Sequence, residues 1–327
     1  MKMSAPTAGT TRFDKKQTMV NSPEYRRLLA LEIKAWGVAN PQNNGGWAQM
    51  QKTIAYRTYR RGTIEKQLDL IRQQGENLDL LELGSADGWF SNEILALSNV
   101  RSMTSIDVAL TQNTSTTYNS KVKLVKGDLN LMEEIQGLKG QKFDCILTRG
   151  TLHHLVDPHA TVDYAINQLL KKDGILVIED SWVRQSLQFK TNAFLYLALY
   201  VLPHSIFDFL RGIITKRGHE SLSDTRRHIR DLILVLFSSG HAEAITHNHS
   251  FSPFESISSA DDYKQIYEGQ NIAVRYFRNF AALPAWHHTY FGRIKFLGEY
   301  VIQPIDDLLI RSRLFVGDLH MCILQKK

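Results

Sequence analysis

The stretch from Asp79 to Gly88 constrains the fold of this chain more than any other part of the sequence. A short apolar run that contains Glu82 leads into the small-residue loop Gly84-Ser85-Ala86-Asp87-Gly88, and a helix-patterned segment begins at Trp89. A strand, a tight turn and a helix N-terminus in this order form the unit from which open α/β folds build nucleotide sites. Small residues let the backbone approach a ligand closely, and the helix start offers N–H groups without helical partners.

Two kinds of nucleotide cofactor use such a turn, and the spacing of its small residues separates them. A nicotinamide site requires G-x-G-x-x-G, whose last glycine lets the helix pack on the strand. Counted from Gly84, Ala86 is tolerable in the second position, but Trp89 is not tolerable in the third. The stretch instead resembles motif I of the class I S-adenosylmethionine-dependent methyltransferases, E/D-x-G-x-G-x-G, with Ala86 in the middle glycine position.

Four later segments resemble the same family, in the family's order along the chain. They are Ser105–Asp107, Lys126–Leu129, Phe143–Leu147 and Gly174–Asp180. The resemblance implies an α/β fold with a Rossmann-like, seven-stranded, mostly parallel sheet, in which the strand order is 3-2-1-4-5-7-6 and strand 7 is antiparallel. It also implies that the cofactor is S-adenosylmethionine and that its product is S-adenosylhomocysteine.

The alternation of strand and helix patterns after Asp79 agrees with parallel pairing and right-handed crossovers. We expect strands near 79–83, 103–107, 121–125, 143–147 and 174–179, and helices near 88–98, 130–138 and 158–171. Upstream, helices are expected from Ser22, with Pro23 at the first helical position, from Trp47, and over Thr63–Gln74. Downstream, a helix is expected over Thr225–Ser239, a sixth strand over Ala242–Ser250 and a final strand over Leu314–Gln325.

These elements predict a core that is interrupted by helical segments. Residues 1–21 are expected to be disordered, 22–77 to form an N-terminal helical cap and 78–180 to form the methyltransferase core. Residues 181–221 and 253–313 are expected to be helical insertions, 222–252 to continue the core and 314–327 to supply the final strand.

Both expected insertions are rich in apolar or aromatic residues and leave the sheet at the carboxyl ends of its strands, where this fold holds its cofactor. We therefore expect them to wall the substrate pocket or to form its lid. The alternative is that they form a homodimer interface. The apolar run Ala193–Leu202 is too short to span a bilayer, and a buried or lid helix is favoured over a contact with a membrane surface.

The resemblance implies roles for specific residues in holding the cofactor. The loop residues Gly84, Ser85, Ala86 and Gly88 approach its methionine part and ribose, and Glu82 matches the family acid that holds the methionine ammonium group. Asp107 matches the acid that binds both ribose hydroxyls, whereas Asp128 and the N–H of Leu129 match the groups that contact adenine. Asp128 has the alternative role of capping the next helix. Arg149, which follows strand 4, is also assigned to the cofactor site.

Methyl transfer to an alcohol gains from a base, and histidine suits neutral pH. The candidates are His153, His154 and Asp180, which lie at the ends of strands 4 and 5. His153 and His154 are adjacent and cannot both point the same way, and a structural role is the alternative for each. Because the end of strand 4 offers no aspartate, we expect no metal. The expected acceptor is a small molecule, apolar or aromatic, that is methylated on a hydroxyl oxygen.

Charge and cysteine content bear on partners and compartment. The net charge of +6 is spread along the chain. In the family that the chain resembles, enzymes that methylate amino groups of nucleic acids carry a [DNS]-P-P-[YFW] motif after strand 4, which is absent here. Enzymes that methylate carbon 5 of pyrimidines need a cysteine in a loop, whereas Cys145 lies within a strand, so a nucleic-acid substrate is disfavoured. Two cysteines indicate a reducing compartment, so we expect a cytoplasmic protein. Cys145 and Cys322 fall on strands 4 and 7, which strand 5 separates, so no disulfide is expected. Two rival functions remain open, a methyltransferase acting on RNA or protein and a non-catalytic cofactor-binding protein.

Overall fold

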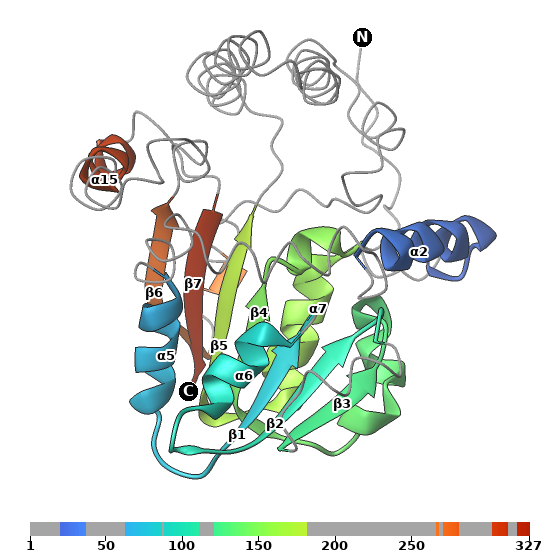
Figure 1. Cartoon of the computed structure of the whole chain (residues 1–327), viewed down its shortest axis with the longest axis horizontal. Helices are drawn as coiled ribbons and strands as arrows, with labels where there is room; N and C mark the ends of the chain where they lie inside the picture. Colours follow the sequence, from blue (N-terminus) through green and yellow to red (C-terminus); the bar gives the residue numbers. More distant parts are fainter. Residues whose placement is uncertain are drawn as a thin grey trace, which may run out of the picture.

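The computed structural model of the 327-residue chain describes residues 20–36, 63–86, 88–110, 121–181, 266–267, 271–280, 303–312 and 319–327. Within these ranges, seven strands form one sheet in the order β3-β2-β1-β4-β5-β7-β6 (Figure 1). The strands are β1 (Leu78–Leu83), β2 (Val100–Asp107), β3 (Val122–Lys126), β4 (Phe143–Arg149), β5 (Leu170–Ser181), β6 (Ile272–Phe280) and β7 (Leu319–Lys326).

The pairing of the strands confirms the expected fold. The pairs β1–β2, β1–β4, β2–β3 and β4–β5 are parallel, whereas β7 pairs antiparallel with both β5 and β6. The carboxyl ends of β1 to β5 therefore meet at one edge of the sheet, which is uppermost in Figure 1. Because β7 is antiparallel to β5, its first residue Leu319 lies at the same edge, opposite Ser181.

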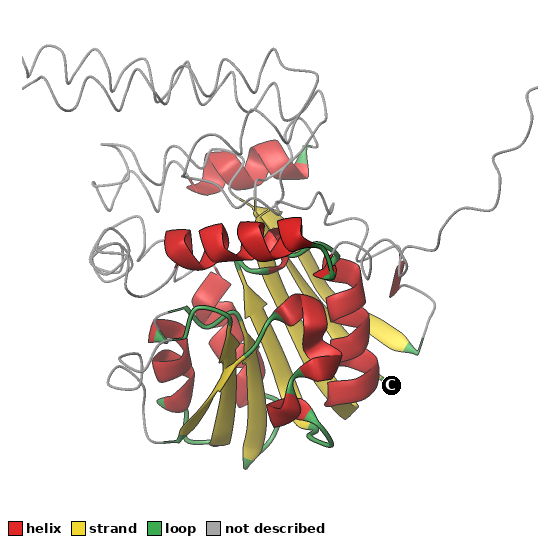
Figure 2. Cartoon of the chain, turned by 90° about the vertical axis from the view of Figure 1, so that its right-hand side faces the viewer, coloured by secondary structure: helices red, strands yellow, loops and turns green. Residues whose placement is uncertain are grey.

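Helices cover both faces of the sheet (Figure 2). The described helices are α2 (Pro23–Trp36), α5 (Glu65–Arg72), α6 (Trp89–Leu95), α7 (Pro158–Tyr164) and α15 (Gln303–Arg311), the 3-10 helices η3 (Leu129–Glu134), η4 (Gln136–Leu138) and η5 (Leu152–His154), and the π-helix η6 (Ala165–Leu169). One apolar core joins α5 and α6 to strand residues such as Leu80, Cys145 and Val177. A second core joins η3, η4, α7 and η6 to the alternate residues Leu81, Ile146 and Ile178. Successive residues of each central strand point into the two cores in turn, so most positions of these strands are buried and apolar residues occupy most of the buried positions.

The helix boundaries follow from local capping. Ser22 Oγ accepts from the N–H of Tyr25 at 3.0 Å, so it caps α2 as expected. Asp157 likewise accepts from the N–H of Ala160 at 3.1 Å at the start of α7. The helix expected over 158–171 is shorter than predicted, because a π-helical turn follows α7 and β5 begins at Leu170.

The prediction of a sixth strand over Ala242–Ser250 is wrong, because the sheet takes this strand from Ile272–Phe280. β6 pairs with β7 from Ile272 opposite Lys326 to Phe280 opposite Leu319. Its aromatic and β-branched residues suit a strand, so this part of 253–313 belongs to the sheet and not to a helical insertion. Residues 242–250 themselves lie outside the described ranges, as do the helices expected from Trp47 and over 225–239 and the apolar run 193–202.

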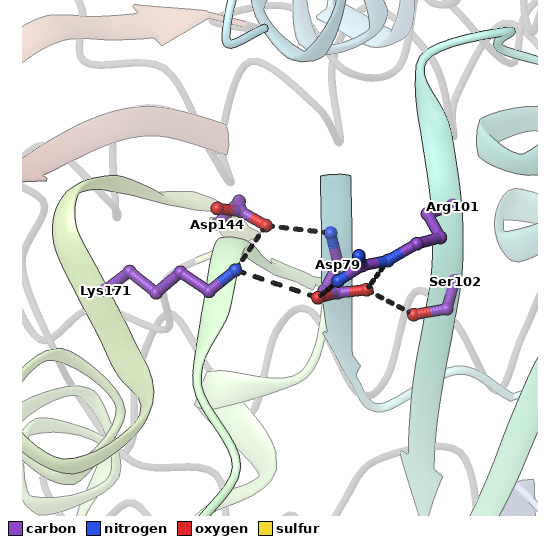
Figure 3. Close-up of polar contacts among 5 residues, drawn as sticks. All are labelled: Asp79, Arg101, Ser102, Asp144 and Lys171. Carbon is purple, nitrogen blue, oxygen red and sulfur yellow. Dashed lines mark hydrogen bonds and ion pairs between the residues drawn. The ribbon is translucent and has the colours of Figure 1, made fainter. Parts of the chain in front are cut away.

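A polar cluster closes the amino-terminal edge of the sheet, away from the carboxyl ends (Figure 3). Asp79 of β1 accepts from Arg101 Nε at 2.9 Å and from Ser102 Oγ at 2.6 Å, both on β2. Lys171 Nζ lies 2.8 Å from Asp144 Oδ2 and 3.7 Å from Asp79 Oδ2. The cluster thus ties together the starts of β1, β2, β4 and β5.

Two further observations concern the cysteines and the bilayer. Cys145 and Cys322 are buried free thiols on strands that β5 separates, which confirms that they form no disulfide. Among the helices that the structure describes, none has the length and apolar character needed to cross a membrane.

Candidate active site

The loop after β1 is held against the neighbouring strand by its own backbone. The N–H groups of Gly84 and Ser85 both donate to the carbonyl of Ile106, at 2.8 and 3.2 Å, and the N–H of Gly88 donates to Ser85 O at 2.9 Å. Gly84 and Gly88 have φ angles of 78° and 77°, which favour glycine. A Cβ on Gly84 would lie only 2.1 Å from Thr151 Oγ1. The sequence therefore needs glycine at 84 for both conformation and space. Asp87 is outside the described residues.

Glu82 is a buried acid near the end of β1, on the face covered by α6. It accepts hydrogen bonds from the hydroxyl groups of Ser91, on α6, and Ser105, on β2. Burial raises the pKa of Glu82 to about 7, although the two serines and nearby Arg149 oppose this rise. A cation held beside Glu82 would favour its ionised form.

Asp107 ends β2 and fastens the loop to that strand. Its Oδ2 accepts from the N–H of Ala86 at 2.9 Å, and its Oδ1 accepts from the N–H of Ala109 at 2.8 Å. Burial raises the pKa of Asp107, and Glu32 of α2 adds to the rise. Each carboxylate oxygen has a second lone pair, so this acid can still accept from a ligand.

Asp128 lies just beyond β3 and does cap the next helix, the alternative role expected for it. Its Oδ1 accepts from the N–H of Asn130 at 2.9 Å, and its Oδ2 accepts from the hydroxyl of Tyr25 on α2. Leu129 is buried, and its carbonyl accepts from Thr161 Oγ1 at 3.1 Å. A capping carboxylate can still accept a hydrogen bond from a ligand. The contact with Tyr25 was not expected from the sequence.

Arg149, at the end of β4, is part of a buried polar group on the same face as Glu82. Its Nε donates to Glu179 Oε1 at 3.1 Å, and its guanidinium lies 5.1 Å from the ring centre of Phe90. The other oxygen of Glu179 accepts from Gln67 of α5. Burial, with a contribution from Asp180, raises the pKa of Glu179 well above its ordinary value.

His153 and His154 turn to different partners, as their adjacency requires. The rings are 3.9 Å apart and tilted by 41°. His153 contacts Asp180 twice: its backbone N–H donates to Oδ2 at 3.1 Å, and its ring Nδ1 contacts Oδ1. His154 Nδ1 instead lies 3.0 Å from Glu32 Oε1. Burial alone would raise the pKa of Asp180, but His153, with smaller effects of His320 and His154, holds it below its ordinary value.

Expected site residues therefore lie on opposite faces of the sheet. Glu82 and Arg149, the latter paired with Glu179, contact α6, whereas Asp180 contacts His153 of η5. Successive strand residues point to opposite faces, which explains how the adjacent acids Glu179 and Asp180 serve different groups. Both groups lie at the carboxyl ends of β1, β4 and β5.

Sequence reasoning missed several residues that contact the expected ones directly or through one another, among them Tyr25, Glu32, Gln67 and Glu179. Tyr25 and Glu32 lie on α2, which crosses near the carboxyl ends of the strands (Figures 1 and 2). They are seven residues apart, which places them on one face of the helix. That spacing was a usable signal, but only the packed structure shows what the face contacts.

Comparison with known proteins agrees with this geometry. Residues 56–211 match a family model described as a methyltransferase domain. No curated protein sequence matches the chain. A solved complex from Haloferax volcanii pairs the Trm112 methyltransferase activator with a protein described as a methyltransferase. That structure has a TM-score of 0.51 and 12% identity, and the match covers 90% of this chain and 97% of that one.

Two other solved structures are less similar in fold. The plantazolicin methyltransferase BpumL, in complex with SAH, has a TM-score of 0.46 and 12% identity, with 96% of this chain and 99% of that chain covered. A protein from Galdieria sulphuraria described as a sarcosine dimethylglycine methyltransferase has a TM-score of 0.44 and 12% identity, with 81% and 84% covered.

Proposed function

We propose that the chain is a class I S-adenosylmethionine-dependent methyltransferase, an interpretation that the match of residues 56–211 to a methyltransferase-domain model supports, and that it methylates a hydroxyl oxygen of a small molecule. The contact between His153 and Asp180 carries this proposal. A buried carboxylate at Nδ1 fixes the neutral ring in the tautomer with its proton on Nδ1, so that Nε2 is the proton acceptor. An alcohol needs such a base more than an amine or a phenolate does.

The residues at the strand ends fit the cofactor. S-adenosylmethionine presents an ammonium group, two ribose hydroxyls and an adenine amino group, all of which are hydrogen-bond donors. Glu82, Asp107 and Asp128 supply carboxylate acceptors at the ends of β1, β2 and β3, which are adjacent in the sheet. Neighbouring strands are about 4.8 Å apart, so the three acids extend over roughly the length of the cofactor. The loop residues Gly84, Ser85 and Ala86 follow β1, and the backbone N–H of Ala86 donates to Asp107.

In the proposed reaction, bound S-adenosylmethionine supplies an electrophilic methyl group on a positively charged sulfur. His153 accepts the proton of the acceptor hydroxyl at Nε2 as the oxygen becomes a nucleophile. Asp180, whose Oδ2 accepts from the backbone N–H of His153, then stabilises the imidazolium through Nδ1–H and so keeps the ring oriented. Arg149, positioned by Glu179, gives Glu82 a nearby positive charge that favours its ionised form.

The acceptor pocket in this proposal is built by the chain that leaves the sheet after Ser181 and after Phe280. Ser181 and Phe280 both lie opposite Leu319 and therefore at the carboxyl edge, beside His153 and Asp180. We place the activity in the cytoplasm, because both cysteines are free thiols.

The test is a screen of alcohol and phenol acceptors in which formation of S-adenosylhomocysteine is measured. Once an acceptor is found, His153→Ala and Asp180→Asn should each lower kcat by about 10²-fold or more, while the affinity for S-adenosylhomocysteine stays within about threefold. Asp69→Asn, on the exposed surface of α5, is the matched control for loss of a carboxylate. Full activity of both site variants, or turnover only with RNA or protein acceptors, would contradict the proposal.

A further inference from the structure

Glu32 is a buried carboxylate whose contacts account for only one of its oxygens. The residue is only 7% exposed. Its Oε1 lies 3.0 Å from His154 Nδ1. Its Oε2 is buried and finds no hydrogen-bond donor among the residues that the structure describes. A buried carboxylate oxygen without a donor costs free energy unless a ligand or water supplies one.

The surroundings of Glu32 lie at the end of β2. His154, its partner, follows β4 in η5, and the carboxyl group of Asp107 is close enough to both for their charges to affect its pKa in opposite directions. Both oxygens of Asp107 already accept a backbone N–H. Two carboxylates and one histidine thus gather where a single acid was expected to bind the ribose hydroxyls.

Helix α2 holds Glu32 in this place by contacts of its own. Tyr25, two turns earlier on the same face, donates its hydroxyl to Asp128. A small apolar cluster, separate from the two main cores, joins Tyr25 and Leu28 to Leu131 and Val156. The helix is therefore anchored at Asp128, beyond β3, and at His154, beyond β4, and it crosses the expected positions of adenine and ribose.

We propose that Glu32 is a further cofactor-binding residue that accepts a ribose hydroxyl at Oε2 and shares the vicinal diol with Asp107. The proposal rests on the cofactor part of the proposed function and not on the identity of the acceptor. A vicinal diol has two O–H donors, and in this arrangement one donates to Glu32 and the other to Asp107. Oε2 of Glu32 thereby gains the donor that it lacks, and the hydroxyls lie between the two negatively charged carboxylates. His154 fixes the orientation of Glu32 in this arrangement.

Calorimetry with two ligands tests the proposal, namely S-adenosylhomocysteine and its 2′,3′-dideoxy analogue. Glu32→Ala should weaken binding of S-adenosylhomocysteine by about 10- to 100-fold, the effect expected for a hydrogen bond to a charged group, and should change binding of the analogue by less than about twofold. Glu32→Gln, which keeps a weaker neutral acceptor, should give an intermediate loss. Glu24→Ala, an exposed acid on the same helix, is the control and should change neither affinity.

Each other outcome has a clear meaning. An equal loss for both ligands would show that Glu32 only docks α2, and an unchanged affinity for both would show that it makes no contact, so either result overturns the proposal. If Asp107→Asn still weakens binding of S-adenosylhomocysteine in those cases, the cofactor site itself stands. Failure to find a hydroxyl acceptor would leave this binding test unaffected.

Discussion

The Nε–H of Arg149 donates to Oε1 of Glu179 at 3.1 Å, and the two residues are directly paired across β4 and β5. Their side chains are 13% and 3% exposed, so both groups are largely shielded from water. Removing one partner of a buried pair typically costs about 3–5 kcal/mol, because the other partner stays buried.

We therefore predict that Glu179→Ala lowers the free energy of unfolding by about 3 kcal/mol or more. Glu179→Gln should cost less than half of that, because burial already favours the protonated acid and the amide oxygen can still accept from Arg149. Urea denaturation at pH 7 measures both variants, with exposed Asp69→Ala as the control. Equal losses for the two Glu179 variants would show that the carboxylate charge itself stabilises the pair.

Gly84→Ala should be strongly destabilising, because the new methyl group would lie 2.1 Å from Thr151 Oγ1 and φ is 78°. Gly140→Ala is a matched control, since its φ is 71° and nothing lies within 4 Å of the added Cβ. The control measures the cost of the left-handed backbone alone, about 1–2 kcal/mol. The Gly84 variant should lose about 1–3 kcal/mol more from overpacking. Similar melting temperatures for the two variants would contradict the steric argument.

Glu82 should make stability depend on pH with a defined sign. Its pKa is raised from 4.5 to about 7 in the folded protein, so the folded state holds a proton that the unfolded state has lost. The stability gained from this proton is complete below pH 4.5 and is lost as the pH rises through 7. Relative to Glu82→Gln, the wild type should therefore lose about 3 kcal/mol of unfolding free energy across this interval. A pH-independent difference between the two proteins would refute the assignment of the pKa.

Asp79 should show the opposite dependence. Hydrogen bonding to Arg101 is the main reason that its pKa lies below 3.8, so its contribution is present above pH 3.8 and is lost as the pH falls through the lowered value. Because Arg101 is largely exposed, Asp79→Asn should cost only about 1 kcal/mol at neutral pH. Denaturation at pH 7 and near pH 3 measures the difference, which should shrink at the lower pH. A larger difference at pH 3 would contradict this assignment.

The parallel half of the sheet could be predicted from the sequence because each strand is followed by a strong boundary signal. Examples are Gly84 after β1, which the positive φ of the backbone requires, and Asp157, one of the few residue types that can cap α7. The sixth strand could not be predicted in the same way. Residues 242–250 and 272–280 both carry strand-like patterns, and only pairing with β7 decides between them.

The candidate site likewise contains residues that could be identified from the sequence and residues that could not. The acids Glu82, Asp107 and Asp128 could be identified because each lies at or near the end of a strand, a position that the local pattern determines. Tyr25 and Glu32 could not be identified, because their role depends on where α2 packs, more than 90 residues away from Asp128 and His154 in sequence. Their seven-residue spacing places them on one helix face, but contacts at such separation follow from tertiary packing, so no local pattern identifies their partners.

The position of β7 between β5 and β6 also determines the order in which the sheet can be completed. β7 comes after both of its neighbours in the chain, and within the described sheet β6 pairs with no other strand. During synthesis, β5 must therefore wait with an open edge, and β6 must wait for its one partner in the described sheet, until the segment Leu319–Lys326 has emerged. An open edge of this kind is prone to pair with other chains, so the protein is most vulnerable to aggregation in this interval, when chaperones would be of greatest benefit.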